Sequence, residues 1–328
     1  MMDGSGNYLP AEEEQAPADP AALAAARREA FAALKSAAEG GDADAQARMG
    51  EVCYKGNFAD CGQERDWAAS VRWYRAAAEQ GHLKAQKVVA AAYWLGQGVE
   101  ADAAEALRWY EAAAEQGDAD ALFALAQMAF QGKGMDEDWE RSFAYLRRAA
   151  DATLQSGAKD STILSTLAVY YDNGIGTDED KKAALTCAQQ ALQGDKPTPK
   201  AFFLMGQYYA EGQGGLEQDD AKALSYYRAA AIEGDKEAQC NLGSAYAMGR
   251  GCEPDMQRAL VWFRASAAQG CAMAMVNLGR CFMLGDGVER DEAAARRYFE
   301  QAVQRGSKEA VQYLQILDGE FADEAAAE

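Results

Sequence analysis

The sequence contains few of the residues that build metal and catalytic centres. It has a single histidine, His82, and none of its seven cysteines belongs to a CxxC pair. A Cys/His zinc site needs several such residues at short, regular spacings, so the sequence predicts no metal site. His82 directly follows a glycine, in a slot that holds Asp118 or Asp235 elsewhere, and we interpret it as a helix-start residue.

Long apolar runs and an excess of basic charge are also missing. No stretch of about eighteen uncharged apolar residues occurs, so no membrane span is predicted. Lysine and arginine number 32 against 52 acidic residues, which gives a formal net charge of −20. Such a surface repels phosphate backbones and anionic lipids, so neither nucleic acid nor membrane is expected as a partner. It favours a basic protein partner, with plain solubility as the alternative explanation.

The ends of the chain and its cysteines suggest a cytoplasmic protein. Residues 1–20 carry no lysine or arginine, unlike a secretory leader, and we expect a disordered acidic tail there and another at 318–328. In a reducing compartment the cysteines are expected to be free, buried thiols. A local disulfide between Cys53 and Cys61, which bracket one loop, is the alternative.

What the sequence has in abundance is repetition. The nonapeptide WYRAAAEQG at 73–81 returns as WYEAAAEQG at 109–117, with one residue changed. Glycines at the position of its last residue recur at intervals of 36 to 40 residues, at Gly41, Gly81, Gly117, Gly157, Gly194, Gly234, Gly270 and Gly306. A period of this length indicates stacked supersecondary units. These intervals define seven full units at 41–306. The units recur because each one can bury its apolar face only against its neighbours.

Each unit has the pattern of a helix, a tight turn and a second helix. Ala85, Val88 and Val89 lie at helical spacing, and this first helix ends at a Gly-x-Gly pair. Six such pairs occur, at Gly96/Gly98, Gly132/Gly134, Gly174/Gly176, Gly212/Gly214, Gly249/Gly251 and Gly285/Gly287. Dinucleotide-binding glycine loops follow a strand, whereas these follow a helix, so the sequence predicts no cofactor.

The second helix of each unit is predicted to begin at an aspartate cap and to bury aromatic rings. The expected caps after the glycine pairs are Asp102, Asp138, Asp180, Asp219, Asp255 and Asp291. We expect both rings of a recurring aromatic pair to point inward, at Trp73/Tyr74, Trp109/Tyr110, Tyr226/Tyr227, Trp262/Phe263 and Tyr298/Phe299. Helices at 21–40, with Phe31 and Leu34 as its apolar face, and at 307–317 would close the two ends of the stack.

One unit departs from this pattern. Its second helix has Cys187 and Ala188 in place of the aromatic pair, and Pro197 and Pro199 follow. Because proline disfavours helix in its neighbourhood, the stretch 157–199 is predicted to loosen or bend the array. Sequence drift without a structural consequence is the alternative.

These motifs resemble the Sel-1-like repeat family, a relative of the tetratricopeptide repeats. The likeness is clearest in AQCNLGSAYAMGRGCEPD at 238–255 and ALVWFRASAAQG at 259–270. The resemblance implies an all-α, right-handed superhelical solenoid of paired helices with a concave binding face, used as a protein-interaction adaptor or scaffold. A secreted branch of the family has a cysteine bridge in each repeat and is associated with penicillin binding. This sequence has alanines where that pairing would need sulfur.

The candidate binding residues follow from the expected inner face. If the first helices line the inner curve, one slot projects into it two residues before the turn's first glycine. That slot holds Tyr54, Trp94, Phe130, Asp172, Ala210, Ala247 and Met283. The first three are aromatic, a type enriched at binding hot spots, and would form a track for a partner. Packing of these rings against the next unit is the alternative. The polar flanks would be Glu51, Lys55, Lys84, Lys87, Gln127, Gln131 and Arg280.

The leading functional hypothesis is a cytoplasmic, non-catalytic adaptor that holds a protein or peptide in the groove. An acidic, immunity-type inhibitor that neutralises a basic partner is the second hypothesis. A hydrolase of β-lactams or cell-wall peptides is the third, and it is suggested only by the cysteine-rich relatives. The sequence predicts no catalytic residue for it, since no serine or cysteine has a general base near it in the chain.

Overall fold

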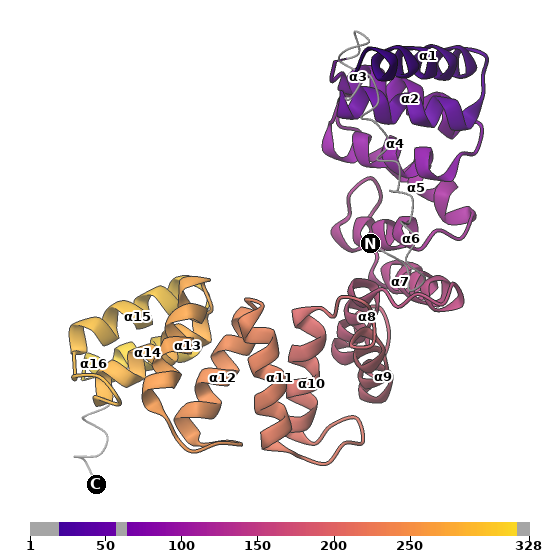
Figure 1. Ribbon diagram of the computed structural model, residues 1–328. Helices are drawn as coiled ribbons and strands as arrows, with labels where there is room; N and C mark the ends of the chain where they lie inside the picture. Colours follow the sequence, from indigo (N-terminus) through magenta and orange to yellow (C-terminus); the bar gives the residue numbers. More distant parts are fainter. Residues whose placement is uncertain (1–19, 57–63, 320–328) are drawn as a thin grey trace, which may run out of the picture. The chain divides into compact units, whose positions relative to one another are not determined.

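The computed structural model describes residues 20–56 and 64–319, which fold into sixteen α-helices with no strand among them. The predicted all-α repeat architecture is confirmed. The described chain divides into two compact units, one ending at Glu137 and the other beginning at Asp138. In each unit the helices stack in chain order (Figure 1). None of the described helices has the length and apolar content to cross a membrane.

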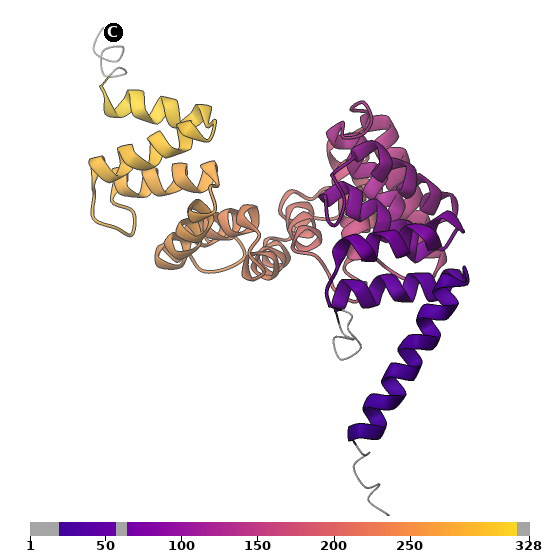
Figure 2. The ribbon, with the colours of Figure 1, turned by 90° about the horizontal axis from the view of Figure 1, so that it is seen from above.

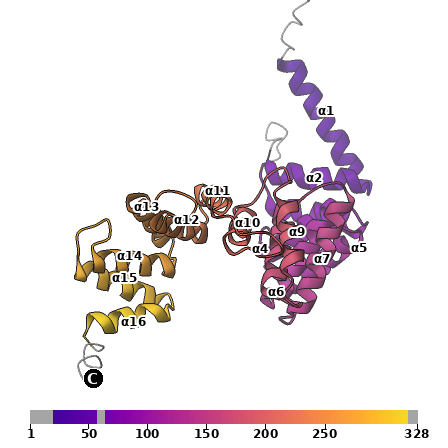
Figure 3. The same ribbon diagram turned by 90° about the horizontal axis from the view of Figure 1, so that it is seen from below.

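The first unit contains six helices. They are α1 (Pro20–Glu39), α2 (Ala43–Lys55), α3 (Trp67–Glu79), α4 (Leu83–Leu95), α5 (Ala103–Glu115) and α6 (Ala119–Gln131). After α1, even-numbered helices are the first helices of repeats and odd-numbered ones are the second helices. Most of α1 is exposed, and it leaves the stack at an angle (Figures 2 and 3). Its Phe31 and Leu34 pack against a buried cluster of Ala38, Ala45 and Met49, which joins α1 to α2.

The second unit contains ten helices. They are α7 (Trp139–Gln155), α8 (Ser161–Asn173), α9 (Lys181–Ala191), α10 (Pro199–Glu211), α11 (Asp220–Ile232), α12 (Lys236–Met248), α13 (Met256–Ala268), α14 (Ala272–Leu284), α15 (Glu292–Gln304) and α16 (Lys308–Leu317). Pro199 begins α10 behind the cap residue Thr198, because proline suits the first helical turn, where no N–H partner is needed. The looser array predicted for 157–199 stays a prediction.

Side-chain caps start the helices where the sequence predicted them. Every predicted aspartate cap of a second helix accepts a backbone hydrogen bond, as in Asp102 Oδ1 from Ala104 N at 2.9 Å. His82 caps α4 through Nδ1, which accepts from Ala85 N at 3.1 Å, and its Nε2 lies 3.4 Å from an Asp44 carboxylate oxygen. The plain structural interpretation of His82 is therefore confirmed.

The two rings of each aromatic pair are not both buried, which corrects the sequence-based expectation. The second ring is usually the buried one: Tyr74 is 4% exposed and Phe299 is fully buried, while the first ring lies partly open. A glycine in the first helix makes room for it, because a Cβ on Gly50 would lie 2.6 Å from a Tyr74 ring carbon. The pair Trp109/Tyr110 reverses this order, with Trp109 buried and Tyr110 half-buried.

The second glycine of each pair locks one repeat onto the preceding one. At Gly98, φ is +75° and a Cβ would lie 2.5 Å from the carbonyl oxygen of Trp67, the first residue of α3. Glycine alone combines this backbone conformation with so close an approach. The same contact recurs at Gly251 on Asp220 of α11.

The glutamine of the nonapeptide also joins neighbouring repeats. Gln116 Nε2 donates to Gln86 Oε1 at 2.7 Å, and Gln86 Nε2 donates to Ala78 O at 3.4 Å. Equivalent pairs are Gln80 with Gln46 at 2.8 Å and Gln269 with Gln239 at 2.9 Å. The nonapeptide therefore recurs because each copy builds the same joint.

Three expectations fall outside the described residues. They concern 1–19 and 320–328, where most of the two acidic tails would lie, and Cys61. Its suggested disulfide partner, Cys53, is a free, buried thiol.

Candidate functional site

The three predicted aromatic slots are exposed to different degrees. Tyr54 is 42% exposed and Phe130 is 40% exposed, at the ends of α2 and α6. Trp94, near the end of α4, is half-buried. Each of the three side chains is therefore open to solvent in part, as a contact surface for a partner requires.

Tyr54 forms one wall of an apolar cavity between successive repeats. Its ring centroid lies 5.4 Å from that of Trp67, and the Arg65 guanidinium lies over both rings. The cavity has a volume of about 250 Å³ and is open to solvent. Its lining residues are Tyr54, Trp67, Ser70, Val71, Tyr74, Val88, Ala91, Ala92 and Gln97. We call it the Tyr54 pocket. It offers one partner side chain a predominantly aromatic and aliphatic surface.

A cavity in the same place of the repeat occurs in the second unit, with different chemistry. It has a volume of about 180 Å³ and lies between α10, α11 and α12. The tyrosine is kept, as Tyr227 in place of Tyr74. The other equivalent positions differ: the changes are Tyr54 to Ala210, Trp67 to Asp220, Val88 to Asn241, Ala91 to Ser244 and Gln97 to Arg250. We call it the Asn241 pocket. Its amide, hydroxyl and charged groups suit a polar partner group.

A third cavity repeats the position one unit further along. It also measures about 180 Å³, and we call it the Arg280 pocket after the residue that replaces Ala91. Met256 stands where the first pocket has Trp67, and Asp286 stands where it has Gln97. Arg280 also reaches a ring of α16, with its guanidinium 6.0 Å from the Tyr313 centroid. The predicted slot residue Met283 is half-buried against the core beneath.

A buried tyrosine forms the floor of the first two pockets. Burial raises the pKa of Tyr74 to about 12, and it raises the pKa of Tyr227 to about 12 although a hydrogen bond with Asn241 opposes the shift. Both phenols are therefore neutral at physiological pH. They act as fixed, uncharged surfaces and not as proton-transfer groups.

Trp94 has a partner within its own chain. Lys133, the residue between the glycines of the next repeat, lies with Nζ 5.2 Å from the Trp94 ring centroid. Lys133 occupies the position of Gln97 and Arg250 in the pockets described above. A cation over an aromatic face contributes about 0.5–1 kcal/mol at an exposed site, so a partner ring can displace it.

The predicted polar flanks make contacts across repeats. Glu51 of α2 accepts from Lys55 at 2.5 Å and from Lys84 of α4 at 3.1 Å, and these hydrogen bonds lower the pKa of its carboxyl group. Lys87 of α4 pairs with Asp118 at 2.9 Å and with Asp120 at 2.8 Å. Its charge is thus already balanced. Gln127 and Gln131 of α6 are exposed.

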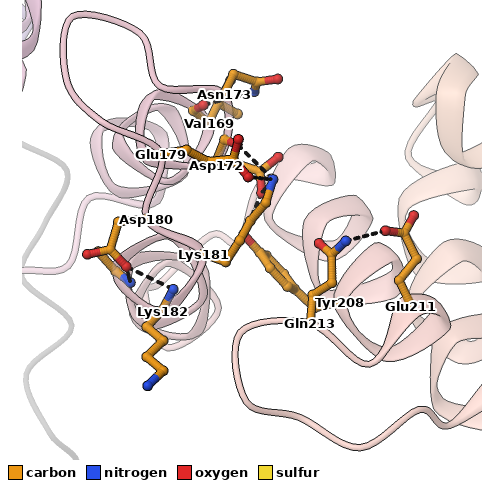
Figure 4. A network of polar contacts seen from close by, with 11 residues as sticks. Val169, Asp172, Asn173, Glu179, Asp180, Lys181, Lys182, Tyr208, Glu211 and Gln213 are labelled. Carbon is orange, nitrogen blue, oxygen red and sulfur yellow. Dashed lines mark hydrogen bonds and ion pairs between the residues drawn. The ribbon is translucent and has the colours of Figure 1, made fainter.

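In the first repeat of the second unit, the slot that holds Tyr54 in the first unit holds Asp172, which belongs to a polar network. Tyr208 of α10 donates to Asp172 Oδ1 at 2.6 Å, and Lys181 Nζ lies 3.1 Å from the same oxygen and 3.0 Å from Glu179 Oε1 (Figure 4). Tyr208 is 1% exposed, and burial raises its pKa together with the bond to Asp172. The network ties α8, α9 and α10 together. Each side chain in it has at least one partner from another helix or loop, so the network serves the packing of repeats.

Several pocket residues were not predicted from the sequence. Trp67, Val88 and Gln97 come from three different segments, whereas the predicted track contained one slot of the first helix only. Aligning the units by their capping aspartates would have placed Trp67 one residue after the cap Asp66. Within the described residues, no group of three or more His, Cys, Asp or Glu side chains is arranged to hold a metal ion.

The repeat signature matches a known family over most of the chain. The Sel1 repeat profile matches residues 43–82, 83–118, 119–154, 167–195, 199–235, 236–271 and 272–307. The chain belongs to the Sel1 repeat family. Repeat solenoids of this kind typically serve as surfaces for protein interaction.

Solved structures of other Sel1 repeat proteins have a similar fold. A protective antigen of uropathogenic Escherichia coli with an SLR fold superposes with a TM-score of 0.68 at 29% identity, over 87% of this chain and 58% of that one. This chain thus spans little more than half the length of that protein. A Sel1 repeat protein from Oxalobacter formigenes gives a TM-score of 0.65 at 30% identity, over 78% of this chain and 96% of that one. No curated protein matches the chain.

Proposed function

We propose that this chain is a non-catalytic adaptor that binds a partner polypeptide, and that the Tyr54 pocket receives one large apolar side chain of that partner. The observation that carries the proposal is the pocket itself, an open apolar cavity of about 250 Å³ with two aromatic walls. Filling an apolar cavity with an apolar side chain stabilises the complex by roughly 25 cal/mol per Å² of apolar surface buried.

The surroundings of the pocket favour a partner segment with mixed polarity. Lys55 and Lys84 share Glu51 near its wall, and Arg65 covers Tyr54 and Trp67. The chain as a whole carries a net charge of −20. The net charge would accelerate the encounter with a basic partner, the apolar anchor would supply affinity, and the cations beside the pocket would favour a polar or acidic residue next to the anchor. The cytoplasm remains the proposed compartment.

A peptide-display experiment tests the proposal. A random peptide library would be selected on the full chain, and the binders would be retested on Val88→Asn, which gives the Tyr54 pocket the residue that the second unit has at Asn241. We expect an enriched aromatic or large aliphatic position and an affinity loss of about tenfold, which corresponds to about 1.4 kcal/mol.

Val261→Asn is the matched control, because Val261 lies on α13 and is 60% exposed away from every pocket described above. Its binding should equal that of the unchanged chain. Equal binding by a folded Val88→Asn protein, or a selection without an apolar position, would refute the role of the pocket.

A further inference from the structure

At two places the fifth residue of a first helix contacts the cap residue of the next first helix. In the first unit, Lys87 of α4 pairs with Asp118, the cap of α6, at 2.9 Å. In the second unit, Ser165 of α8 accepts from Thr198, the cap of α10, at 2.9 Å. These two positions therefore bring side chains of neighbouring repeats into direct contact. We call them the staple positions.

Two cysteines occupy the staple positions between α12 and α14. Cys240 is the fifth residue of α12 and Cys271 is the cap residue of α14, and each thiol is the largest influence on the pKa of the other, so the two side chains interact. The pair Ser165/Thr198 shows that the positions suit a short bridge, because its hydroxyl oxygens are bonded to Cβ as cysteine sulfurs are. We propose that Cys240 and Cys271 form a peroxide-sensitive dithiol that oxidises to a reversible disulfide between successive repeats.

The two thiols have complementary environments. Cys240 is 1% exposed, and its sulfur accepts from Asn277 Nδ2 at 3.7 Å, whereas Cys271 is half-buried and open in part to solvent. The neighbouring Cys240 thiol, together with Ser266 and the first N–H groups of α14, lowers the pKa of Cys271 to about 5. The contact with Cys271 and burial raise the pKa of Cys240. The negative charge of Glu237 raises it further. Cys271 is thus the thiolate and Cys240 the resolving thiol.

The reaction balances with hydrogen peroxide as the oxidant. The Cys271 thiolate attacks one peroxide oxygen, the O–O bond breaks, and the departing hydroxide takes a proton to give water and a sulfenic acid. The Cys240 sulfur then attacks the Cys271 sulfur, the S–O bond breaks, and the second oxygen leaves as water with the Cys240 proton. Two thiols and one peroxide become one disulfide and two waters. A dithiol reductant reverses the change.

The disulfide would act on the Arg280 pocket. Asn277 lines that pocket and donates to the sulfur of Cys240, so a change at this sulfur reaches the pocket directly. Oxidation would also fix α12 to α14, whose facing residues form the pocket.

Peptide mapping of the oxidised full chain tests the proposal. The reduced protein would be treated with an equivalent of hydrogen peroxide, blocked with a maleimide and digested without reductant. We expect a peptide linking Cys240 to Cys271 as the main disulfide product. In Cys240→Ser, dimedone should instead trap a sulfenic acid at Cys271. Cys252→Ser, which alters another half-buried cysteine, should give the same linked peptide as the unchanged chain.

Alkylation kinetics provide a second readout that needs no substitution. At pH 6, iodoacetamide should modify Cys271 at least about tenfold faster than Cys252 in the unchanged chain, because only a thiolate reacts. Comparable rates for these two cysteines, or oxidation that links either staple cysteine to a different one, would overturn the proposal. So would over-oxidation of Cys271 without any disulfide in the unchanged chain.

Discussion

The Tyr54 pocket and the Asn241 pocket occupy the same place in the repeat, yet one is apolar and the other polar. Their shared elements are a tyrosine floor, Tyr74 or Tyr227, and a glycine beneath its ring, Gly50 or Gly206. The elements that differ face the cavity, as Val88 and Asn241 do. The comparison shows that the two pockets share a frame of tyrosine and glycine and differ in the residues that line them.

The frame is constrained because its residues perform two tasks at once. Gly98 and Gly251 each end a turn in the left-handed region and touch the start of a preceding second helix. A side chain there would strain the backbone and push two repeats apart. Half-buried lining residues that differ between the pockets, such as Val88 and Ala91, have no such double role, so substitutions there cost less stability.

The largest effect is therefore expected from a change to the frame. Gly98→Ala and Gly251→Ala should each lower the free energy of unfolding of their unit by about 2–4 kcal/mol, from left-handed strain and overpacking together. Gly81→Ala is the control, since φ is +86° there but nothing lies within 4 Å of the added Cβ. It should cost about 1–2 kcal/mol from strain alone.

Urea unfolding followed by hydrogen exchange of the amides in each unit would measure these losses. If Gly98→Ala costs no more than Gly81→Ala, the contact with Trp67 does not lock the repeats, and the shared frame loses its physical basis.

A smaller loss of stability is expected from a change to the polar network around Asp172. Tyr208→Phe removes the donor to Asp172 Oδ1 but leaves Lys181 in place, so we expect a destabilisation of about 1.5–2 kcal/mol. Tyr209→Phe, at the half-buried neighbouring position, should change stability by less than about 0.5 kcal/mol. Denaturant unfolding of the two variants measures the difference. Equal stabilities would mean that the network does not hold α8 to α10.

Exchanging the lining sharpens the comparison further. Asn241→Val, Ser244→Ala and Arg250→Gln together give the Asn241 pocket three residues of the Tyr54 pocket and leave the Tyr227 and Gly206 residues in place, although Tyr227 loses its hydrogen bond with Asn241. Peptides selected through the Tyr54 pocket should then bind a second site in the same chain, with an affinity gain of about tenfold at that site. Calorimetric titration would report the number of sites. A stoichiometry of one would show that these three lining residues do not determine specificity.

The sequence predicted the frame far better than the lining. Caps such as Asp102 and turn glycines such as Gly98 act within a few residues of their position, so their pattern is readable along the chain. The pocket joins Tyr54, Trp67 and Val88 from three helices, and no local pattern links them. The prediction that both rings of each aromatic pair point inward was wrong. The glycine of the first helix leaves room for one ring only, and the other ring stays partly exposed.

The smallest expected effect concerns the charged rim of the Tyr54 pocket. Glu51 bonds to Lys55 and Lys84, which lowers the pKa of its carboxyl group from the ordinary 4.5. A group with a lowered folded-state pKa stabilises the fold above its unfolded-state pKa, and this contribution disappears as the pH falls through the folded value.

Because Lys84 is exposed, the coupling with Glu51 should stay below about 0.5 kcal/mol and vanish at high salt. A double-mutant cycle with Glu51→Gln and Lys84→Met at pH 7 and pH 3 would measure it. A coupling that persists at pH 3 would show that the two side chains stabilise each other by packing and not by charge. In that case the rim would belong to the frame, and the division between frame and lining would have to be redrawn.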